Sequence, residues 1–294
     1  MLTWLEADPA HESELAKVQR QHDLVALSAP VINELYAKDR RRRFGSVLRR
    51  WSAAAAAVVL LAFGGYYFHA ARDFSRQGER LLSVSVPYGQ RVSLTLQDGT
   101  SVWLNAGTTL RYPALFTGRE RRVEIEGEAR FEVVHDAKHP FIVRTYACDV
   151  EVLGTKFDVT AEEREGLFSA ALLRGSVKVT NRLTPGEQFV LKPNEEVRLA
   201  GRRLNLNAIG SMDDYLWTEG MISIKGLSFG ELMHKFEKSF GVKIRIDRNR
   251  MPEVDYNHGK IRISDGVDSA LRLLQMASDF TYTRSEDNGT IVIR

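Results

Sequence analysis

The sequence lacks several residue patterns that identify common classes of protein. It contains one cysteine, Cys148, in 294 residues, so no disulfide bond can form within the chain. The formal net charge is only +3, which gives no indication of direct nucleic-acid binding. No glycine-rich loop has the spacing of a phosphate-binding motif, and we expect no cofactor. These absences do not favour an enzyme.

The positive charge is local and precedes an apolar segment. Residues 51–68 carry no charge, and as a helix they would extend roughly 27 Å, just enough to cross a bilayer. Interfacial aromatic residues stand at both ends, and a buried core helix is the less favoured alternative. We therefore predict a transmembrane helix over residues 51–70. The residues on which its topology depends are Arg40, Arg41, Arg42, Arg43, Arg49, Arg50, Trp51, Tyr66 and Tyr67.

The arginines also predict an orientation. Six of them precede the apolar segment and fewer follow it, which places the N-terminus in the cytoplasm and the C-terminus in the periplasm. A cleavable signal peptide is disfavoured because about fifty residues precede the segment. The predicted location is the inner membrane of a diderm bacterium, in a single pass, with the arginines against anionic membrane lipid.

Residues 71–84 are expected to be a linker, and residues 85–200 have the pattern of an all-β domain. Short runs with a period of two alternate with turns that contain glycine, aspartate or proline. Asp98-Gly99 lies between two such runs and predicts a hairpin turn. The pattern indicates stacked short strands, of β-helix or sandwich type.

After a connector over residues 201–219, residues 220–294 predict a small α+β domain. Ser228 and Glu231 have the spacing of a capping box at the start of a helix, and Gly241 is placed to end it. A second helix is expected around residues 267–274. The buried faces of these two helices should contain Phe229, Leu232, Met233, Phe236 and Phe240 in the first, and Val267, Ala270, Leu271 and Leu274 in the second.

Three features suggest chemistry but have simpler explanations. Gly226-Leu-Ser228-Phe-Gly230 matches a nucleophile elbow, yet Ser228 is already explained as a helix cap and too little chain follows for a hydrolase. His135 and His139 have the spacing of metal ligands on a helix, but Pro140 puts them in a turn, so we expect no metal site. Cys148 alternates with Val150 and Val152 and is expected to be a buried hydrophobic residue. We predict no catalytic residues.

Taken together, a set of motifs resembles a known family. Their order along the chain is similar to that of the periplasmic FecR domain of transmembrane anti-sigma regulators, and the last seventy-five residues or so look like the short N-terminal domain of secretins and TonB-dependent transporters. The matching segments are Val86-Pro-Tyr-Gly-Gln-Arg-Val-Ser-Leu-Thr-Leu-Gln-Asp-Gly-Thr-Ser-Val-Trp-Leu-Asn-Ala-Gly-Thr-Thr-Leu-Arg-Tyr-Pro, Val123-Glu-Ile-Glu-Gly-Glu-Ala-Arg-Phe-Glu-Val, Pro140-Phe-Ile-Val, Val152-Leu-Gly-Thr-Lys-Phe-Asp-Val, Leu173-Arg-Gly-Ser-Val-Lys-Val and Leu183-Thr-Pro-Gly-Glu-Gln.

The resemblance implies a signalling function and its partners. The signalling domain of an outer-membrane TonB-dependent transporter would engage the periplasmic part, and residues 1–50 would bind an extracytoplasmic-function sigma factor in the cytoplasm. The first helix of the family's cytoplasmic domain has no counterpart here, so either an upstream start or a shortened segment is expected. Apolar residues in this segment suit a partner groove, with packing of the segment on itself as the alternative. The candidate sigma-binding residues are Leu15, Val18, Leu24, Val25, Val31, Ile32 and Leu35.

The predicted fold is therefore multi-domain: a short α-helical cytoplasmic segment, one transmembrane helix, an all-β periplasmic domain and a small α+β C-terminal domain. The predicted function is that of a transmembrane anti-sigma factor or sigma regulator, without catalysis. The alternative is a membrane-anchored periplasmic module that binds carbohydrate or cell wall and has no cytoplasmic role.

Overall fold

The computed structural model describes residues 13–14, 16–24, 58–69, 80–252, 259–285 and 289–294. The chain divides into two compact units, Met1–Asp73 and Phe74–Arg294.

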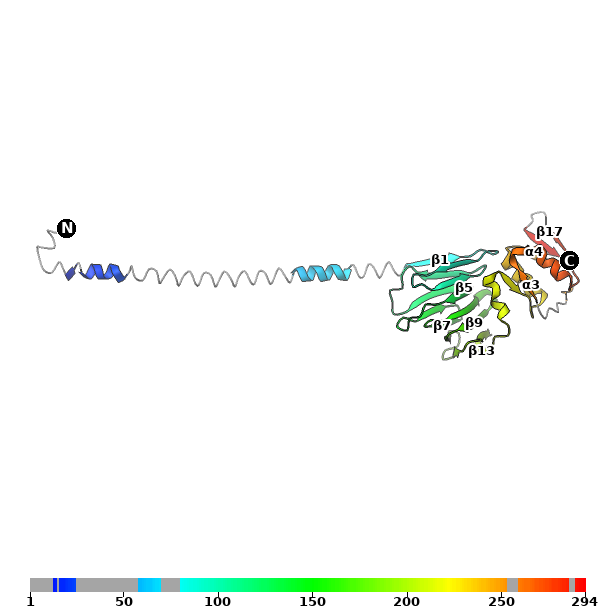
Figure 1. The fold of residues 1–294 in the computed structure, drawn as a ribbon, viewed down its shortest axis with the longest axis horizontal. Coiled ribbons are helices and arrows are strands. Elements are labelled where there is room, and N and C mark those ends of the chain that lie inside the picture. Colours follow the sequence, from blue (N-terminus) through cyan, green and yellow to red (C-terminus); the bar gives the residue numbers. More distant parts are fainter. Residues whose placement is uncertain (1–12, 15, 25–57, 70–79, 253–258, 286–288) are drawn as a thin grey trace. The chain divides into compact units, whose positions relative to one another are not determined.

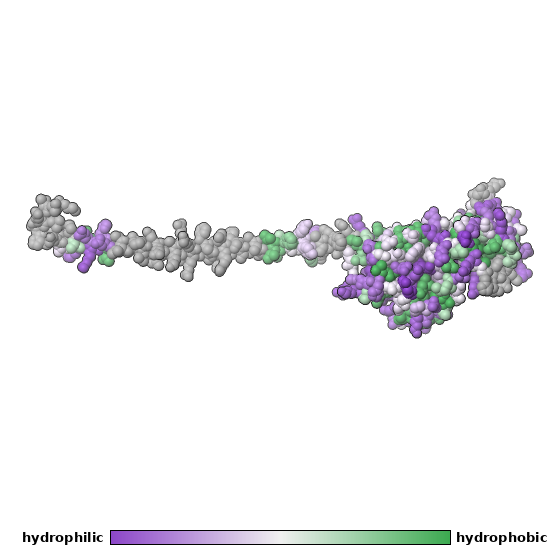
Figure 2. Space-filling model, viewed as in Figure 1, coloured by the Kyte–Doolittle hydropathy of each residue, from purple (hydrophilic) through white to green (hydrophobic). Residues whose placement is uncertain are grey.

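The described part of the N-terminal unit is helical. It comprises residues 13–24, apart from residue 15, and residues 58–69. Hydrophobic side chains lie on the surface of the second segment (Figure 2), where Val58, Leu61 and Phe63 are 65%, 76% and 69% exposed.

The predicted fold class included a transmembrane helix, and this part of the prediction is wrong. Among the residues that the structure describes, no helix is both long and apolar enough to cross a membrane. Residues 58–69 of the predicted range are described and are helical. Residues 51–57 and residue 70 of that range lie outside the described residues.

The second unit begins with a β domain built from thirteen strands in one continuous sheet (Figure 1). The strands are β1 (Leu81–Ser85), β2 (Val92–Thr95), β3 (Ser101–Leu104), β4 (Thr109–Pro113), β5 (Arg121–Glu132), β6 (Phe141–Arg144), β7 (Cys148–Val152), β8 (Lys156–Glu162), β9 (Leu167–Arg174), β10 (Val177–Asn181), β11 (Gln188–Leu191), β12 (Glu195–Ala200) and β13 (Arg203–Ala208). A 3₁₀ turn, η1 (Glu163–Glu165), joins β8 to β9.

The longest strand, β5, connects two halves of this sheet. Its first part pairs with β4 and β6, and its second part, from Gly127, pairs with β3 and β8. The first layer therefore has the order β1-β4-β5-β6-β7-β10-β11, and the second layer has the order β2-β3-β5-β8-β9-β12-β13. Gly127 has a φ of 110°, and a Cβ there would lie 2.6 Å from Oγ1 of Thr108, so the transition requires glycine.

Alternate side chains of the two layers form one hydrophobic core, as expected for strands with one buried face. Phe131 stacks on Phe157 at 5.3 Å between ring centroids, and Phe141 lies 6.0 Å from Phe131. All three rings are fully buried, and the burial of each ring stabilises the fold by up to about 3 kcal/mol. The opposite face of the second layer is consequently left for other elements to cover.

The chain leaves β13 through a 3₁₀ helix, η2 (Met212–Glu219), and enters a small α+β domain. Its elements are β14 (Met221–Ser223), α3 (Phe229–Phe240), β15 (Lys243–Ile246), β16 (Lys260–Arg262), η3 (Ile263–Asp265), α4 (Gly266–Gln275), β17 (Tyr282–Arg284) and β18 (Thr290–Ile293). β14 pairs with β16, while β15, β18 and β17 form a second small sheet in that order. The domain has a hydrophobic core of its own.

The two long helices of this domain form as their sequences predict. Ser228 and Glu231 make the reciprocal capping box of α3, and Gly241 ends the helix with a φ of 66°. The predicted core faces of α3 and α4 are buried, with Phe240 partly buried at the edge.

Candidate functional site

The predicted sigma-binding residues are not brought together by the described part of the chain. Val18 and Leu24 lie in the helical residues 16–24 and are 65% and 66% exposed. The other five, which are Leu15, Val25, Val31, Ile32 and Leu35, lie outside the described residues. Their assignment therefore stays a prediction.

The predicted topology residues divide in the same way. Tyr66 and Tyr67 lie in the helix of residues 58–69 and are 74% and 71% exposed. Trp51 and the six arginines from Arg40 to Arg50 lie outside the described residues.

The most elaborate polar arrangement in the second unit lies on the outer face of its second layer, beneath η2. Arg130 of β5 faces Trp103 of β3 on one side and Asp158 of β8 on the other. Because all three lie in one row across the strands, their side chains leave the sheet on the same face. This face points away from the core, so polar side chains there would ordinarily meet water.

Here the row is covered by the 3₁₀ helix, and two charged side chains are buried. Arg130 and Asp158 are 7% and 3% exposed, and Nε and Nη2 of Arg130 lie 3.3 and 3.2 Å from Oδ2 of Asp158. Trp217 of η2 donates from its indole Nε1 to the same oxygen, at 3.1 Å, and its ring lies 5.6 Å from the guanidinium carbon. Arg130 further donates to Oγ1 of Thr218, at 2.7 Å, and to the carbonyl of Tyr215.

A second contact holds the start of η2. The hydroxyl of Tyr215 donates to Oε2 of Glu196 at 3.1 Å, and Glu196 also pairs with Arg198 at 3.0 Å. Burial, and then the charge of Glu196, raise the pKa of Tyr215. We name the set Arg130, Asp158, Tyr215, Trp217 and Thr218 the connector clamp.

The electrostatics of the connector clamp depend on its burial. Burial is the largest influence on Asp158 and raises the pKa of its carboxyl, and the nearby carboxylate of Glu128 raises it further, while Arg130 and Trp217 lower it. Buried charges are tolerated only when they are paired and hydrogen-bonded, as both are here. The clamp therefore requires η2 to be in place, since removing it would leave Arg130 and Asp158 without several of their partners.

The α+β domain makes a separate polar contact with the β domain through α3. Lys238 pairs with Glu162 and lies 3.6 Å from Glu165, and His234 lies 3.0 Å from Glu165. Burial lowers the pKa of Lys238, but the two carboxylates outweigh it and raise the pKa overall. Glu162, Glu165 and His234 have donor atoms close enough for a metal ion, but the ammonium group of Lys238 already lies against both carboxylates, so we assign no metal there.

Two glycines meet where the turn before β2 reaches the end of α3. The amide of Gly89 donates to the carbonyl of Lys238 at 2.8 Å. Gly89 and Gly241 have φ angles of 80° and 66°, and a Cβ on Gly89 would lie 3.1 Å from the backbone of Gly241. This approach of two backbones leaves no room for a side chain on either residue.

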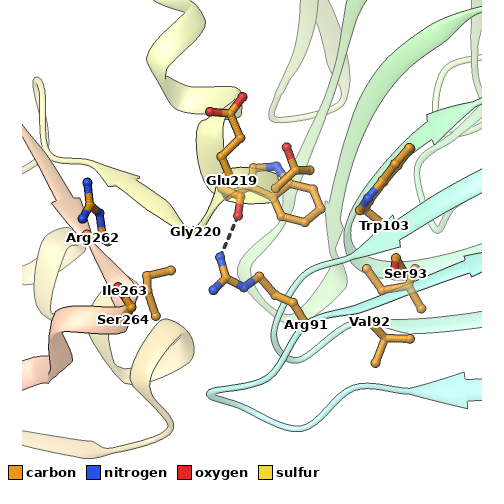
Figure 3. A pocket seen from close by; sticks show the side chains of 12 residues that line it. Arg91, Val92, Ser93, Trp103, Glu219, Gly220, Arg262, Ile263 and Ser264 are labelled. Atoms are coloured by element: carbon orange, nitrogen blue, oxygen red, sulfur yellow. Dashed lines mark hydrogen bonds between the residues drawn. The ribbon is translucent and has the colours of Figure 1, made fainter.

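An open cleft of about 580 Å³ lies between the connector clamp and the α+β domain (Figure 3). Its walls come from β2 and β3, from the end of η2, and from Arg262, Ile263 and Ser264 of β16 and η3. Arg91 reaches across it and donates from Nη1 to the carbonyl of Trp217 at 2.7 Å.

The residues that the sequence singled out as chemical leads have structural roles. Ser228 donates from Oγ to Glu231 at 2.7 Å and caps α3, as predicted. Cys148 is buried and free, and burial followed by the charge of Asp149 raises the pKa of its thiol to about 12. The cap of α3 accounts for Ser228, and packing inside the β domain accounts for Cys148.

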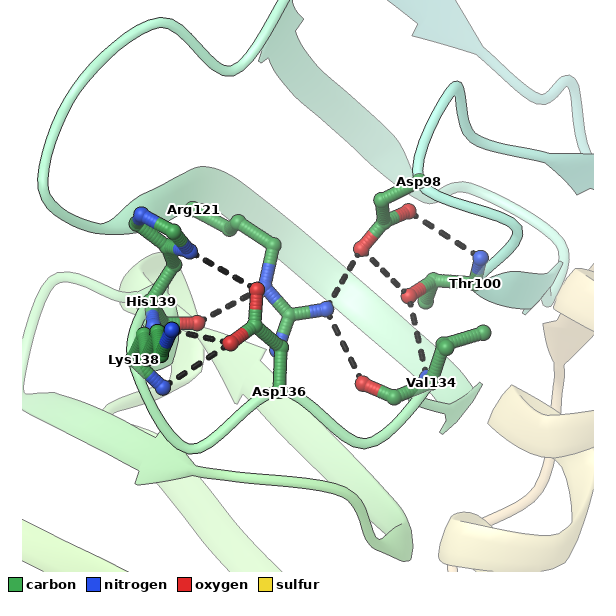
Figure 4. Close-up of polar contacts among 7 residues, drawn as sticks. All are labelled: Asp98, Thr100, Arg121, Val134, Asp136, Lys138 and His139. Atoms are coloured by element: carbon green, nitrogen blue, oxygen red, sulfur yellow. Dashed lines mark hydrogen bonds and ion pairs between the residues drawn. The ribbon is translucent and has the colours of Figure 1, made fainter.

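His139 also has a structural role, in a turn at another end of the β domain (Figure 4). Its Nδ1 lies 2.8 Å from Oδ2 of Asp136, and its carbonyl accepts from Nε of Arg121 at 2.9 Å. Arg121 is 4% exposed and also bonds Asp98 at 2.7 Å and the carbonyl of Val134 at 3.0 Å. The guanidinium of Arg121 thus ties the turn at Asp98 to the connection between β5 and β6.

Sequence reasoning missed the connector clamp. Arg130 and Asp158 occupy alternate positions that read as the exposed face of a strand, and Trp217 lies in a segment read as a polar connector. The available signal was Trp217 itself, because a large aromatic residue in a polar connector usually needs a surface to cover.

Comparisons with known proteins agree with this architecture. Residues 83–178 match the family described as FecR protein, and residues 221–293 match the family described as FecR, C-terminal. No curated protein matches the chain significantly.

Solved structures provide a further comparison. Two crystal structures of a "putative anti-sigma factor" from Parabacteroides distasonis are each 32% identical to this chain, with a TM-score of 0.64. The similarity covers 72% and 73% of this chain and 98% of each solved chain.

Proposed function

Because this chain belongs to the FecR family, we propose that it is an anti-sigma factor or sigma regulator that works by binding and not by catalysis. The connector clamp is the observation that supports a regulatory mechanism most directly. It joins two domains with separate cores through a buried ion pair that is satisfied only while η2 is docked. A partner that displaced η2 would change how the two domains are held.

We further propose the partners at each end. Residues 1–50 bind an extracytoplasmic-function sigma factor, and the unit Phe74–Arg294 receives the signal from the signalling domain of an outer-membrane TonB-dependent transporter. The exposed Val18 and Leu24 support the first contact, because apolar residues on a helix suit a partner groove. The edge strands β15 and β17 of the α+β domain support the second, because an open edge can accept a strand.

The proposed location follows from these partners. Residues 1–50 face the cytoplasm, residues 85–294 face the periplasm, and the arginines between residues 40 and 50 associate with anionic lipid of the inner membrane. Reporter fusions ending at residue 50 and at residue 294 test this assignment. Equal alkaline phosphatase activity from both fusions would contradict it.

The sigma-factor contact is tested by charge substitution in the N-terminal helix. Val18→Asp should abolish co-purification of the full chain with the sigma factor encoded beside it and should change transcription from a promoter that this sigma factor uses. Gln19→Asp is the matched control, because it introduces the same charge at the neighbouring residue of the same described helix. If the wild-type chain fails to bind that sigma factor, the rival function of a carbohydrate- or wall-binding module gains support.

The transporter contact is tested with a chain that ends at Gly220, which keeps the connector clamp and removes the α+β domain. Loss of binding to the transporter's signalling domain is the expected result. Unchanged binding would move the contact to the β domain.

A further inference from the structure

The cleft beside the connector clamp contains two cations that are not neutralised. Arg91 and Arg262 both line it. Among the residues that the structure describes, neither forms an ion pair with a carboxylate, and the bond that Arg91 does form is to the neutral carbonyl of Trp217. Glu219 also lines the cleft, but its carboxylate is directed away from Arg91 (Figure 3). The cleft is therefore locally positive, although the whole chain is nearly neutral.

One wall of the cleft is an open strand edge. In the described part of the chain β2 pairs only with β3. Leu96 donates to the carbonyl of Thr100 at 2.8 Å, so Leu96 faces β3. Residues of an antiparallel strand alternate between facing the partner strand and facing away from it. Ser93 and Thr95 therefore direct their main-chain N–H and C=O groups away from β3.

The same conclusion follows from the next strand pair. Asn105 donates to the carbonyl of Glu128 on β5 at 2.9 Å, so the residues of β3 at odd positions bond β5 and those at even positions bond β2. Val102 and Leu104 accordingly pair with Leu94 and Val92. Ser93 lines the cleft, and no main-chain partner for its N–H and C=O groups is found among the described residues.

From these two observations we propose that the cleft binds an extended, carboxylate-bearing peptide segment of a partner protein. The segment adds to the edge of β2 through the main chain of Ser93, and its acidic side chain lies between the guanidinium groups of Arg91 and Arg262. Guanidinium groups recognise carboxylates with paired N–H donors, and a strand edge recognises an extended main chain. Ser264 lines the far wall, where its hydroxyl donates to Oδ1 of Asp265 at 3.3 Å.

The charge and the strand edge select this occupant over others. A basic segment would meet two arginines, and a helix could not use the outward groups of Ser93. A free anion would use the arginines but not the edge. The inference is independent of sigma-factor binding, because it concerns only what residues of the second unit recognise.

The unit Phe74–Arg294 is suited to a direct test because it is compact, contains both cores, and corresponds to nearly the whole length of the solved relatives. The probe is an end-blocked octapeptide of alternating threonine and valine in which two residues are replaced by glutamate. The matched probe has glutamine at the same two positions. Each peptide is titrated into the protein, and binding is followed through the NMR signals of the protein's backbone amides. We expect the glutamate peptide to bind at least about fivefold more tightly and to shift the amide of Ser93.

Two protein variants and one control locate the charge preference. Arg262→Gln and Arg91→Gln should each reduce the preference for the glutamate peptide to less than about twofold. Arg91→Gln also removes the bond to Trp217, so the exposed Arg262 is the cleaner position. Arg245→Gln, on β15 outside the cleft, removes the same charge and should leave the preference unchanged.

Two modified peptides locate the strand pairing. In one form of the glutamate peptide the main-chain nitrogens of the odd residues are methylated, and in the other form those of the even residues. Because alternate residues direct their N–H groups to the same side of a strand, only one form loses the N–H donors that would face β2. One form should bind like the parent and the other should lose binding. Equal affinity of the glutamate and glutamine peptides, equal effects of both methylation patterns, or stronger binding of a glucuronate oligosaccharide would overturn the proposal.

Discussion

Trp217 donates its indole N–H to Oδ2 of Asp158, the same oxygen that accepts from Arg130. One residue of this pair belongs to the element that leads into the α+β domain, and the other belongs to the β domain. The bond therefore couples the position of the second domain to a buried charge in the first.

Trp217→Phe tests the value of that bond. The phenyl ring keeps most of the apolar contact but leaves Asp158 with one fewer donor in a buried site, so we expect the free energy of unfolding to fall by about 1–3 kcal/mol. Urea unfolding of the unit Phe74–Arg294 measures it. Trp103→Phe is the control, because Trp103 lies in the same cross-strand row and no hydrogen bond of its indole is found among the described residues. Equal effects at both positions would show that the hydrogen bond contributes nothing specific.

The ion pair itself should behave as a unit. Asp158→Ala leaves the buried guanidinium of Arg130 uncompensated and is expected to reduce stability by about 3–5 kcal/mol. The double variant Arg130→Met with Asp158→Leu removes both charges, so it should be less destabilising than Asp158→Ala alone. A double variant as unstable as the sum of its two single changes would contradict a coupled pair.

The approach of Gly89 to Gly241 predicts a position-specific effect of one methyl group. In Gly89→Ala the positive φ alone should lower the free energy of unfolding by about 1 kcal/mol. The added methyl group also meets the backbone of Gly241, which should make the total loss roughly two to three times as large. Gly186→Ala is the control, because Gly186 has a similar φ of 86° and nothing within 4 Å of its added Cβ. Thermal unfolding of both variants separates the two contributions. A similar loss in both would mean that the domains do not depend on this contact.

Cys148 should be unreactive in the folded protein. Burial raises its pKa to about 12, so almost none of the thiol is ionised at pH 8, and the side chain is inaccessible as well. Iodoacetamide should therefore alkylate the chain only after unfolding in urea, as mass spectrometry would detect. Rapid alkylation of the native protein would show that β7 opens readily.

Asp136 predicts a dependence of stability on acid pH. The hydrogen bond to His139, with further bonds from backbone amides, lowers the pKa of Asp136 from 3.8 to about 2. Because the folded pKa is lower than the unfolded one, the stabilisation is present above about pH 4 and is lost as the pH falls towards 2. Between pH 5 and pH 2, the free energy of unfolding should fall less steeply with decreasing pH in Asp136→Asn than in the wild type. The same dependence on pH in both proteins would show that Asp136 is not a cause of it.

Local structure was predictable where neighbouring residues decide it. Asp98 and Gly99 form the turn between β2 and β3, with Asp98 accepting from the amide of Thr100 at 3.0 Å. Ser228 and Glu231 form the expected cap, and Cys148 has the expected burial beside Val150. In each case the deciding interaction spans only a few residues of chain, so the sequence contains it directly.

The transmembrane prediction failed on a different kind of evidence. The apolar composition of residues 51–68 satisfies a length criterion, but no helix among the described residues is long and apolar enough to cross a membrane. Composition over a window reports only how favourable a helix would be in lipid.

The sequence by itself determined the short-range elements of this protein: the alternating strands, the turn at Asp98 and the capped helix at Ser228. Only the tertiary structure decided that Arg130 and Asp158, 28 residues apart, would be buried, because their burial depends on Trp217, a further 59 residues beyond Asp158. A polar residue on the outer face of a strand looks the same in sequence whether water or another element covers it. What covers that face is a property of the whole fold, and here it is the connector between the two domains.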